Sequence, residues 1–169
     1  MVADKNLPVT IRSFKPGDQP VCQKLYVEGL IGGELAKNDT GLDIDNIQAA
    51  YMTEGNHFWV AESEQREIIG MVGVQHHDEG SGEIRRLRVR QDVRRRGVGS
   101  QLLEAAIKFC KDRGYLKVAL DTFVEREAAL KLFEKFRVRH ERTKSVCGKE
   151  LLYFYLDLYT SDAPPQRKP

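Results

Sequence analysis

The sequence has few cysteines, little net charge and no long apolar run. Its three cysteines, Cys22, Cys110 and Cys147, are odd in number and lack C-x-x-C spacing, which argues against a disulfide framework or a structural metal site. Residues 1–9 contain no apolar stretch of signal-peptide length, and the run 151–159 is too short to span a bilayer as a helix. We therefore expect a soluble cytoplasmic protein with no metal and no membrane partner.

The formal net charge is only +2, from 27 Lys and Arg residues against 25 Asp and Glu residues. This balance is too small to imply general nucleic-acid binding. The arginines are unevenly placed, however, with seven between Arg85 and Arg96. This stripe lacks the interleaved aromatic side chains of single-strand binders, so we expect no nucleic-acid partner.

Length and composition fit one globular domain. A chain of 169 residues, 41% hydrophobic and 31% charged, is large enough to bury a core, and it shows no internal repeat. We assign residues 1–160 to this single domain. The proline-containing segment 161–169 is predicted to be a disordered tail.

Apolar periodicity predicts both strands and helices. Strands are expected at 9–14, 57–61, 67–75, 83–90, 116–121, 138–143 and 150–158, and helices at 19–35, 43–53, from 98 to Gly114, and 125–136. Asp43 is the expected N-cap of the second helix. Because a helix joins the strand at 83–90 to the strand at 116–121, these two strands should be parallel.

The segment Arg94-Arg95-Arg96-Gly97-Val98-Gly99 joins a predicted strand to a predicted helix. Free N–H groups and the helix dipole favour an anion at such a position. Gly97 and Gly99 have no side chains to hold a diphosphate away from the backbone amides. A dinucleotide-binding Rossmann turn is disfavoured, because no third glycine is correctly spaced. The alternative is a basic helix start that contacts only solvent.

The element order and this turn resemble the GNAT superfamily of acyl-CoA-dependent N-acetyltransferases. The pattern Leu87-x-Val89, followed by Arg94-x-x-Gly97-x-Gly99, is similar to the superfamily signature Q/R-x-x-G-x-G/A for the coenzyme A pyrophosphate. The resemblance implies a GNAT-like α/β (α+β) fold with a central mixed, mostly antiparallel sheet of about seven strands flanked by about four helices. It also implies acetyl-CoA as the cosubstrate.

The resemblance further implies which residues contact the donor. The main chain of Leu87 and Val89 should pair with the pantetheine arm, and the N–H of Leu87 should stabilise the oxyanion. The side chains of both residues are also expected in the core. The full set of expected coenzyme A contacts is Leu87, Val89, Arg94, Arg95, Arg96, Gly97, Val98, Gly99, Ser100 and Arg126.

Glu83 is the leading candidate for the catalytic base. An amine arrives mostly protonated, so the transfer needs a group that removes a proton, and the superfamily often places a catalytic carboxylate at this position. The competing interpretation is that Glu83 pairs with an arginine across the hairpin. His76 and His77 are second choices, because histidine can relay a proton near neutral pH.

The helix at 125–136 departs from the superfamily pattern. Phe133 stands where a tyrosine usually protonates the leaving thiolate, and Arg126 stands where asparagine is frequent. Phenylalanine cannot donate a proton. Water, another tyrosine such as Tyr153, or unassisted departure of the thiolate all stay open, as does a non-catalytic module that binds acyl-CoA.

The acceptor is the least specified part of the site. Its pocket should form from residues 32–43 and the last strands with Tyr153, Tyr155 and Tyr159. Four neighbouring arginines either attract an acceptor carboxylate or form a solvated sheet face, namely Arg85, Arg86, Arg88 and Arg90.

We expect acetyl transfer to a primary amine of a small molecule or amino acid by direct attack on the thioester. Protein N-acetylation is an alternative. The superfamily often dimerises, so a homodimer is one expected arrangement, for which the tyrosine-rich last strand offers an edge.

Overall fold

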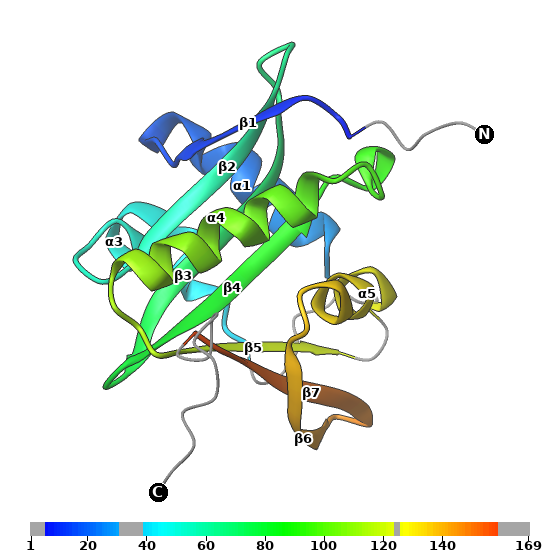
Figure 1. Ribbon diagram of the computed structural model, residues 1–169. Helices are drawn as coiled ribbons and strands as arrows, with labels where there is room; N and C mark the ends of the chain where they lie inside the picture. The colour runs from blue at the N-terminus through cyan, green and yellow to red at the C-terminus, as the bar shows by residue number, and fades with distance from the viewer. Residues whose placement is uncertain (1–5, 31–38, 124–125, 159–169) are drawn as a thin grey trace, which may run out of the picture.

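The computed structural model describes residues 6–30, 39–123 and 126–158, in which seven strands form one sheet. The strands are β1 (Val9–Ser13), β2 (His57–Ser63), β3 (Ile68–Asp78), β4 (Ser81–Val89), β5 (Lys117–Phe123), β6 (Arg139–Val146) and β7 (Lys149–Asp157). Their order across the sheet is β1-β2-β3-β4-β5-β7-β6. Only β4 and β5 pair in parallel (Figure 1), so the predicted mixed, mostly antiparallel sheet is confirmed.

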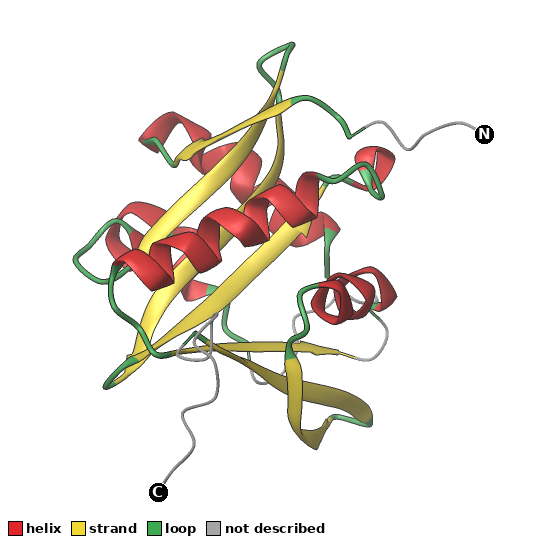
Figure 2. Ribbon diagram, viewed as in Figure 1, coloured by secondary structure: helices red, strands yellow, loops and turns green. Residues whose placement is uncertain are grey.

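Helices cover both faces of this sheet (Figure 2). The α-helices are α1 (Gln19–Glu28), α2 (Leu42–Asp45), α3 (Ile47–Tyr51), α4 (Val98–Asp112) and α5 (Glu127–Lys135), and the short 3₁₀ turns are η1 (Pro16–Asp18) and η3 (Gln91–Val93). Helix α4 crosses β2, β3 and β4 on one face, and α1 lies behind them on the other (Figure 1).

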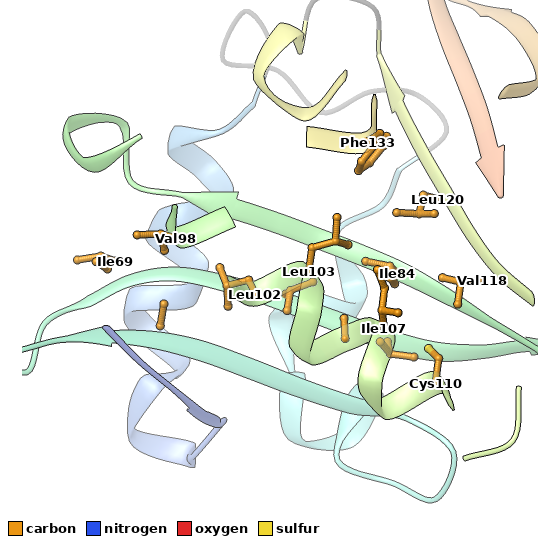
Figure 3. Close-up of a cluster of buried hydrophobic side chains, with 14 of the residues drawn as sticks. Ile69, Ile84, Val98, Leu102, Leu103, Ile107, Cys110, Val118, Leu120 and Phe133 are labelled. Carbon is orange, nitrogen blue, oxygen red and sulfur yellow. The ribbon is translucent and has the colours of Figure 1, made fainter. Parts of the chain in front are cut away.

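Two apolar cores result, one on each face. Figure 3 shows the first, in which Leu102, Leu103 and Ile107 of α4 pack against Ile84 of β4 and neighbouring strands. The second joins α1, α2 and α3 to β2 and β3 through ten buried side chains, including Tyr51. Both faces of the central strands are therefore buried, which explains why β3 is apolar along most of its length.

The helices before β2 differ from the prediction. Helix α1 ends at Glu28, with Gly29 as its C-cap, and the predicted residues 31–35 lie outside the described part of the chain. The helix predicted at 43–53 is two short helices, because Asn46 leaves helical geometry (φ −148°, ψ 80°) and its side chain caps α3. Gly41, not Asp43, is the N-cap of α2, so that expectation was wrong.

The remaining boundaries follow the prediction closely. Gly114 has φ +78°, the left-handed conformation expected after the end of α4. Strand β4 begins at Ser81, two residues earlier than expected, because β3 continues to Asp78. The last strand, β7, lies between β5 and β6 and is not an edge, so the edge expected for a dimer belongs to β6 instead. The tail 161–169 lies outside the described residues.

Strands β4 and β5 separate soon after they meet. They pair only from Ser81 to Glu83 of β4, and beyond that point the two strands diverge (Figure 1). Strand β4 also shifts register against β3, and Arg86 at this bulge has φ +58°. The bulge directs two successive side chains to the α1 face, since Arg85 bonds Gln75 while Arg86 bonds Asp43.

Gly73 is required where the ring of Tyr51 crosses β3. A Cβ at this position would lie 2.6 Å from Cε1 of Tyr51 and 2.9 Å from Cδ2 of Phe58. We expect Gly73→Ala to lower the free energy of unfolding by about 1–3 kcal/mol, as overpacking does, when measured by urea denaturation. Gly17→Ala is the control, because no atom lies within 4 Å of its Cβ position. An equal loss in both variants would contradict the packing explanation.

Candidate active site

A groove of about 1310 Å³ lies between the diverging strands β4 and β5 and the N-terminal ends of α4 and α5. It gathers nearly all of the residues expected from the sequence, namely Glu83, Leu87, Val89, Arg94, Arg95, Gly97, Val98, Gly99, Ser100 and Arg126. Arg96 is the exception. Its side chain is exposed outside the groove, and its carbonyl accepts a hydrogen bond from the N–H of Leu7 at 2.8 Å.

The main chain of β4 faces this groove at Leu87 and Val89. The N–H of Arg90 donates to the carbonyl of Ile69 in β3, whereas the carbonyl of Val89 accepts from Nε of Arg94 at 3.1 Å. Because N–H and C=O directions alternate along a strand, the polar groups of Leu87 and Val89 point away from β3. Their side chains pack against the core beneath α4, so the two expected roles are compatible.

The turn before α4 has the geometry of an anion site. Gly97 is the N-cap, with φ +81°, a conformation that favours glycine. It provides no side-chain cap, so the first N–H groups of a 15-residue helix lack a capping side chain. Gly99 follows in the first turn, where a Cβ would lie 3.3 Å from Leu132 of α5. At Gly99 the backbone of the turn therefore faces α5 without a side chain of its own, while Ser100 in the next position bonds Nζ of Lys135 at 3.0 Å.

Glu83 lies at the closed end of the groove, where β4 and β5 still pair. Its Oε2 is 3.3 Å from Nδ1 of His77, and its Oε1 is 3.7 Å from Nε of Arg85. The arginine partner of Glu83 is therefore in the same strand, and the side chain that contacts Glu83 from β3 is that of His77. His76 points elsewhere, toward the ring of Tyr115 at 5.9 Å. The structure thus places Glu83, the first candidate base, in contact with His77, one of the two second choices.

Asp121 is a groove residue that the sequence did not single out. It belongs to β5 and lines the same groove as Glu83. Burial raises the pKa of Asp121, and the negative charge of Glu83 raises it further. The sequence feature that could have indicated this residue is an aspartate directly after the apolar residues Val118 to Leu120. Its access to a ligand, however, depends on the divergence of β4 and β5, which the sequence does not reveal.

Phe133 occupies the position expected from the sequence and is 4% exposed. Its ring packs edge-on against Phe154 at 5.4 Å, and it also lines the groove. No tyrosine lines the groove within the described residues. Tyr153 instead lies under the guanidinium of Arg142, which is 4.3 Å from its ring centre. Tyr159 lies outside the described part of the chain.

The arginines in β4 and directly after it do not form one solvated face. Arg90 fits that expectation, since it is partly exposed and pairs with Asp92 at 2.7 Å. Arg86 does not, because its side chain is only 6% exposed and bonds both Asp39 and Asp43. Its guanidinium also lies 4.9 Å from the ring centre of Tyr26 in α1. Arg86 therefore fastens α1 and α2 to the bulge of β4.

Burial raises the pKa of Asp43, but hydrogen bonds from Arg86 and Tyr51 outweigh it and hold the pKa below its usual range. Asp39 behaves in the same way, with Arg86 as its main partner. Both carboxylates consequently stay charged at neutral pH. This cluster was not predicted, because Asp43 was assigned to a helix cap and the contact with Arg86 spans 43 residues of sequence.

Comparison with known proteins finds similarity to acetyltransferases. The model of the acetyltransferase (GNAT) family matches residues 31–137. N-acetyltransferase 8 from Homo sapiens is 35% identical over 98 residues, covering 54% of this chain and 43% of that protein. N-acetylaspartate synthetase from Danio rerio is 34% identical over 99 residues, covering 57% of this chain and 35% of that protein. The chain spans about half the length of the curated relatives that it matches.

Solved structures support the same fold. The crystal structure of an acetyltransferase of the GNAT family from Staphylococcus aureus Mu50 aligns with a TM-score of 0.78. The alignment covers 89% of this chain and 99% of that one at 17% sequence identity, which shows likeness of fold. Among the described helices, none is long and apolar enough to cross a membrane.

The pairing of Asp43 with Arg86 predicts a pH-dependent contribution to stability. A carboxyl whose pKa is lowered on folding stabilises the folded state above its unfolded pKa, about 3.9, and loses that contribution as the pH falls. We expect Asp43→Asn to lower the free energy of unfolding at pH 7 by about 1–3 kcal/mol, measured by urea denaturation. The difference from the wild type should narrow below about pH 4.

Asp45→Asn is the matched control, because Asp45 lies in the same helix α2 but is exposed. Its effect should stay below about 0.5 kcal/mol at every pH. A loss in Asp43→Asn that stayed constant from pH 7 to pH 3 would contradict the ion-pair explanation.

Proposed function

This chain belongs to the acetyltransferase (GNAT) family, and we propose that it transfers an acetyl group from acetyl-CoA to the primary amine of a small molecule or amino acid. The observation that carries the proposal is the groove between β4 and β5, which joins an exposed strand edge to a glycine turn at the start of α4. The pantetheine arm of coenzyme A needs a free strand edge, and its pyrophosphate needs an anion site such as the glycine turn.

The groove residues fit coenzyme A. Beyond Glu83, β4 has no pairing with β5, so the main chain at Leu87 and Val89 is available to a ligand that adds like a strand. The first-turn N–H groups of α4 suit a diphosphate, and Arg94 and Arg95 line the groove beside them. Arg126, at the N-cap of α5, lines the opposite wall.

In the proposed reaction, the unprotonated amine attacks the thioester carbonyl, an N–C bond forms, and the C–S bond then breaks. The N–H of Leu87 stabilises the negative charge that develops on the carbonyl oxygen. Glu83 takes the proton released by the amine, and His77, 3.3 Å away and half exposed, passes it toward solvent.

The leaving thiolate receives its proton from water in this proposal. Phe133 has no proton to donate, and no tyrosine lines the groove within the described residues. A thiol has a pKa of about 8.5, which makes the thiolate a fair leaving group without an acid.

The cytoplasm is the proposed location, because Cys22, Cys110 and Cys147 are all free thiols. We propose neither a nucleic acid nor a membrane as a partner.

The function and the role of Glu83 are tested together by thiol release from acetyl-CoA across a panel of primary amines. We expect the wild type to turn over at least one amine and Glu83→Gln to lower kcat/KM about 100-fold near pH 7, the range for loss of a general base. The loss should shrink at high pH, where more of the amine is already unprotonated.

Glu67→Gln is the control, since Glu67 is exposed and its side chain pairs with Arg90 at 3.4 Å, away from the groove. An unchanged kcat/KM in Glu83→Gln across pH would show that another group is the base. A wild type that is stabilised by acetyl-CoA in thermal unfolding but releases no thiol would instead be a non-catalytic acyl-CoA-binding module.

A tyrosine at position 133 should supply the missing acid. Because Phe133 lines the groove, we expect Phe133→Tyr to raise kcat by about tenfold, at the modest end of acid catalysis, in the same thiol-release assay. Phe136→Tyr is the control, since Phe136 terminates the same helix but does not line this groove. Unchanged turnover in Phe133→Tyr would show that protonation of the thiolate does not limit the rate.

A further inference from the structure

Two guanidinium groups meet at the end of α1, in the wall of the groove. Nη2 of Arg126 donates to the carbonyl of Gly29 at 2.6 Å. Arg88 reaches the same residue from β4, and its Nε and Cδ would lie 2.7 and 2.8 Å from a Cβ on Gly29. The absence of a side chain at Gly29 therefore leaves room for Arg88, and both arginines line the groove.

Arg88 forms no ion pair with the described residues, although the charge of Asp39 is near enough to act on it. Its one recorded hydrogen bond runs from Nη1 to the carbonyl of Leu87 at 2.9 Å, and its buried Nε has no hydrogen-bond partner there. Burial lowers the pKa of Arg88, and the positive charges of Arg126 and Arg86 lower it further. A buried cation without an anion is costly, so this arrangement favours binding of an anion.

The nearby described carboxylates have other partners. Asp39 bonds Arg86 through both of its oxygens, and its pKa is held low by that contact. Glu28, which precedes Gly29, is exposed and faces Lys24 at 3.9 Å. By comparison, the partly buried Arg12 contacts Asp18 at 2.8 Å and Glu62 at 2.9 Å. Arg88 is thus the groove arginine of β4 whose charge the described residues leave unmatched.

We infer that the acceptor carries a carboxylate as well as an amine, and that Arg88, with Arg126 beside it, binds this carboxylate. The inference rests on the proposed acetyl transfer and names its substrate class as amino acids. A guanidinium binds a carboxylate through two parallel hydrogen bonds, which would satisfy the orphaned Nε of Arg88.

The position of Arg88 favours the acceptor over the donor as the source of the anion. Its side chain lies against Gly29 of α1, whereas the neighbouring side chains of Leu87 and Val89 pack on the α4 face. The adjacent N–H of Leu87 is the group assigned to the thioester oxygen. A carboxylate at Arg88 therefore belongs to a molecule whose amine is only a few bonds away, as in an amino acid.

The first test uses the wild type alone. Thiol release is compared for L-amino acids, their amides and their decarboxylated amines, with rates corrected for the unprotonated fraction of each amine. We expect kcat/KM to be about 10- to 100-fold higher for the amino acids, the range for a charge-assisted hydrogen bond. Equal rates for amino acids and decarboxylated amines would overturn the inference but leave the proposed function intact. No turnover of any amine would contradict the proposed function itself.

The second test removes the charge and keeps most of the side-chain length. Arg88→Met should raise KM for the amino acid at least about tenfold, while KM for acetyl-CoA and for the decarboxylated amine stays unchanged. Arg90→Met is the matched control, because Arg90 is two residues after Arg88 but pairs with Asp92 outside the groove.

A rise in KM for acetyl-CoA in Arg88→Met would show that the anion is a phosphate of the donor and would overturn the inference. Thermal unfolding of the variant shows whether it folds. If it does not, the comparison of substrates on the wild type decides alone.

Discussion

The separation of β4 from β5 is the constraint on which the rest of this structure depends. The two strands are adjacent and parallel, yet they pair only from Ser81 to Glu83. From Ile84 to Val89 the edge of β4 toward β5 has no strand partner among the described residues, although N–H and C=O groups in a protein interior need one. A ligand with amide groups of its own can supply these partners. The groove is therefore both a gap in the sheet and a binding surface.

The bulge at Arg86 is the local cause that sets side-chain directions beyond this point. A left-handed backbone at a residue other than glycine costs about 1–3 kcal/mol, so the surrounding contacts must hold it. Here the contacts are the two carboxylates Asp39 and Asp43 and the ring of Tyr26. They join the bulge to α1 and α2 and so fix the helices that border the groove.

Most of the fold could be predicted from the sequence, because it depends on local patterns. The apolar repeat of α4, the turn at Gly114 and the apolar runs of β2 and β3 all correspond to observed elements. The helix predicted at 43–53 failed because Asn46 ends one short helix and caps the next, a competition between side chain and backbone that apolar spacing does not reveal. The place of β7 inside the sheet likewise depends on long-range pairing.

The glycine turn was also predictable, because the strand, the turn and the helix are consecutive in the chain, from Ser81 to Asp112. The separate environments of Arg85, Arg86, Arg88 and Arg90 were not. A strict alternation would place Arg86, Arg88 and Arg90 on one face and Arg85 on the other. The bulge breaks that alternation. Arg85, Arg86 and Arg90 have partners in β3, α2 and the η3 turn, whereas Arg88 bonds the carbonyl of its neighbour Leu87. Identical residue types therefore acquire different chemistry from contacts that alternation along a strand does not predict.

The buried ion cluster also affects the electrostatics of the groove. Arg86 is neutralised by Asp39 and Asp43, which removes two nearby carboxylates as partners for Arg88. Replacing that cluster with apolar side chains would fasten α1 equally well, since buried ion pairs contribute little net stability. The cluster thus neutralises Arg86, which holds the helices against β4, and leaves Arg88 as the arginine of β4 that is available to an anionic ligand.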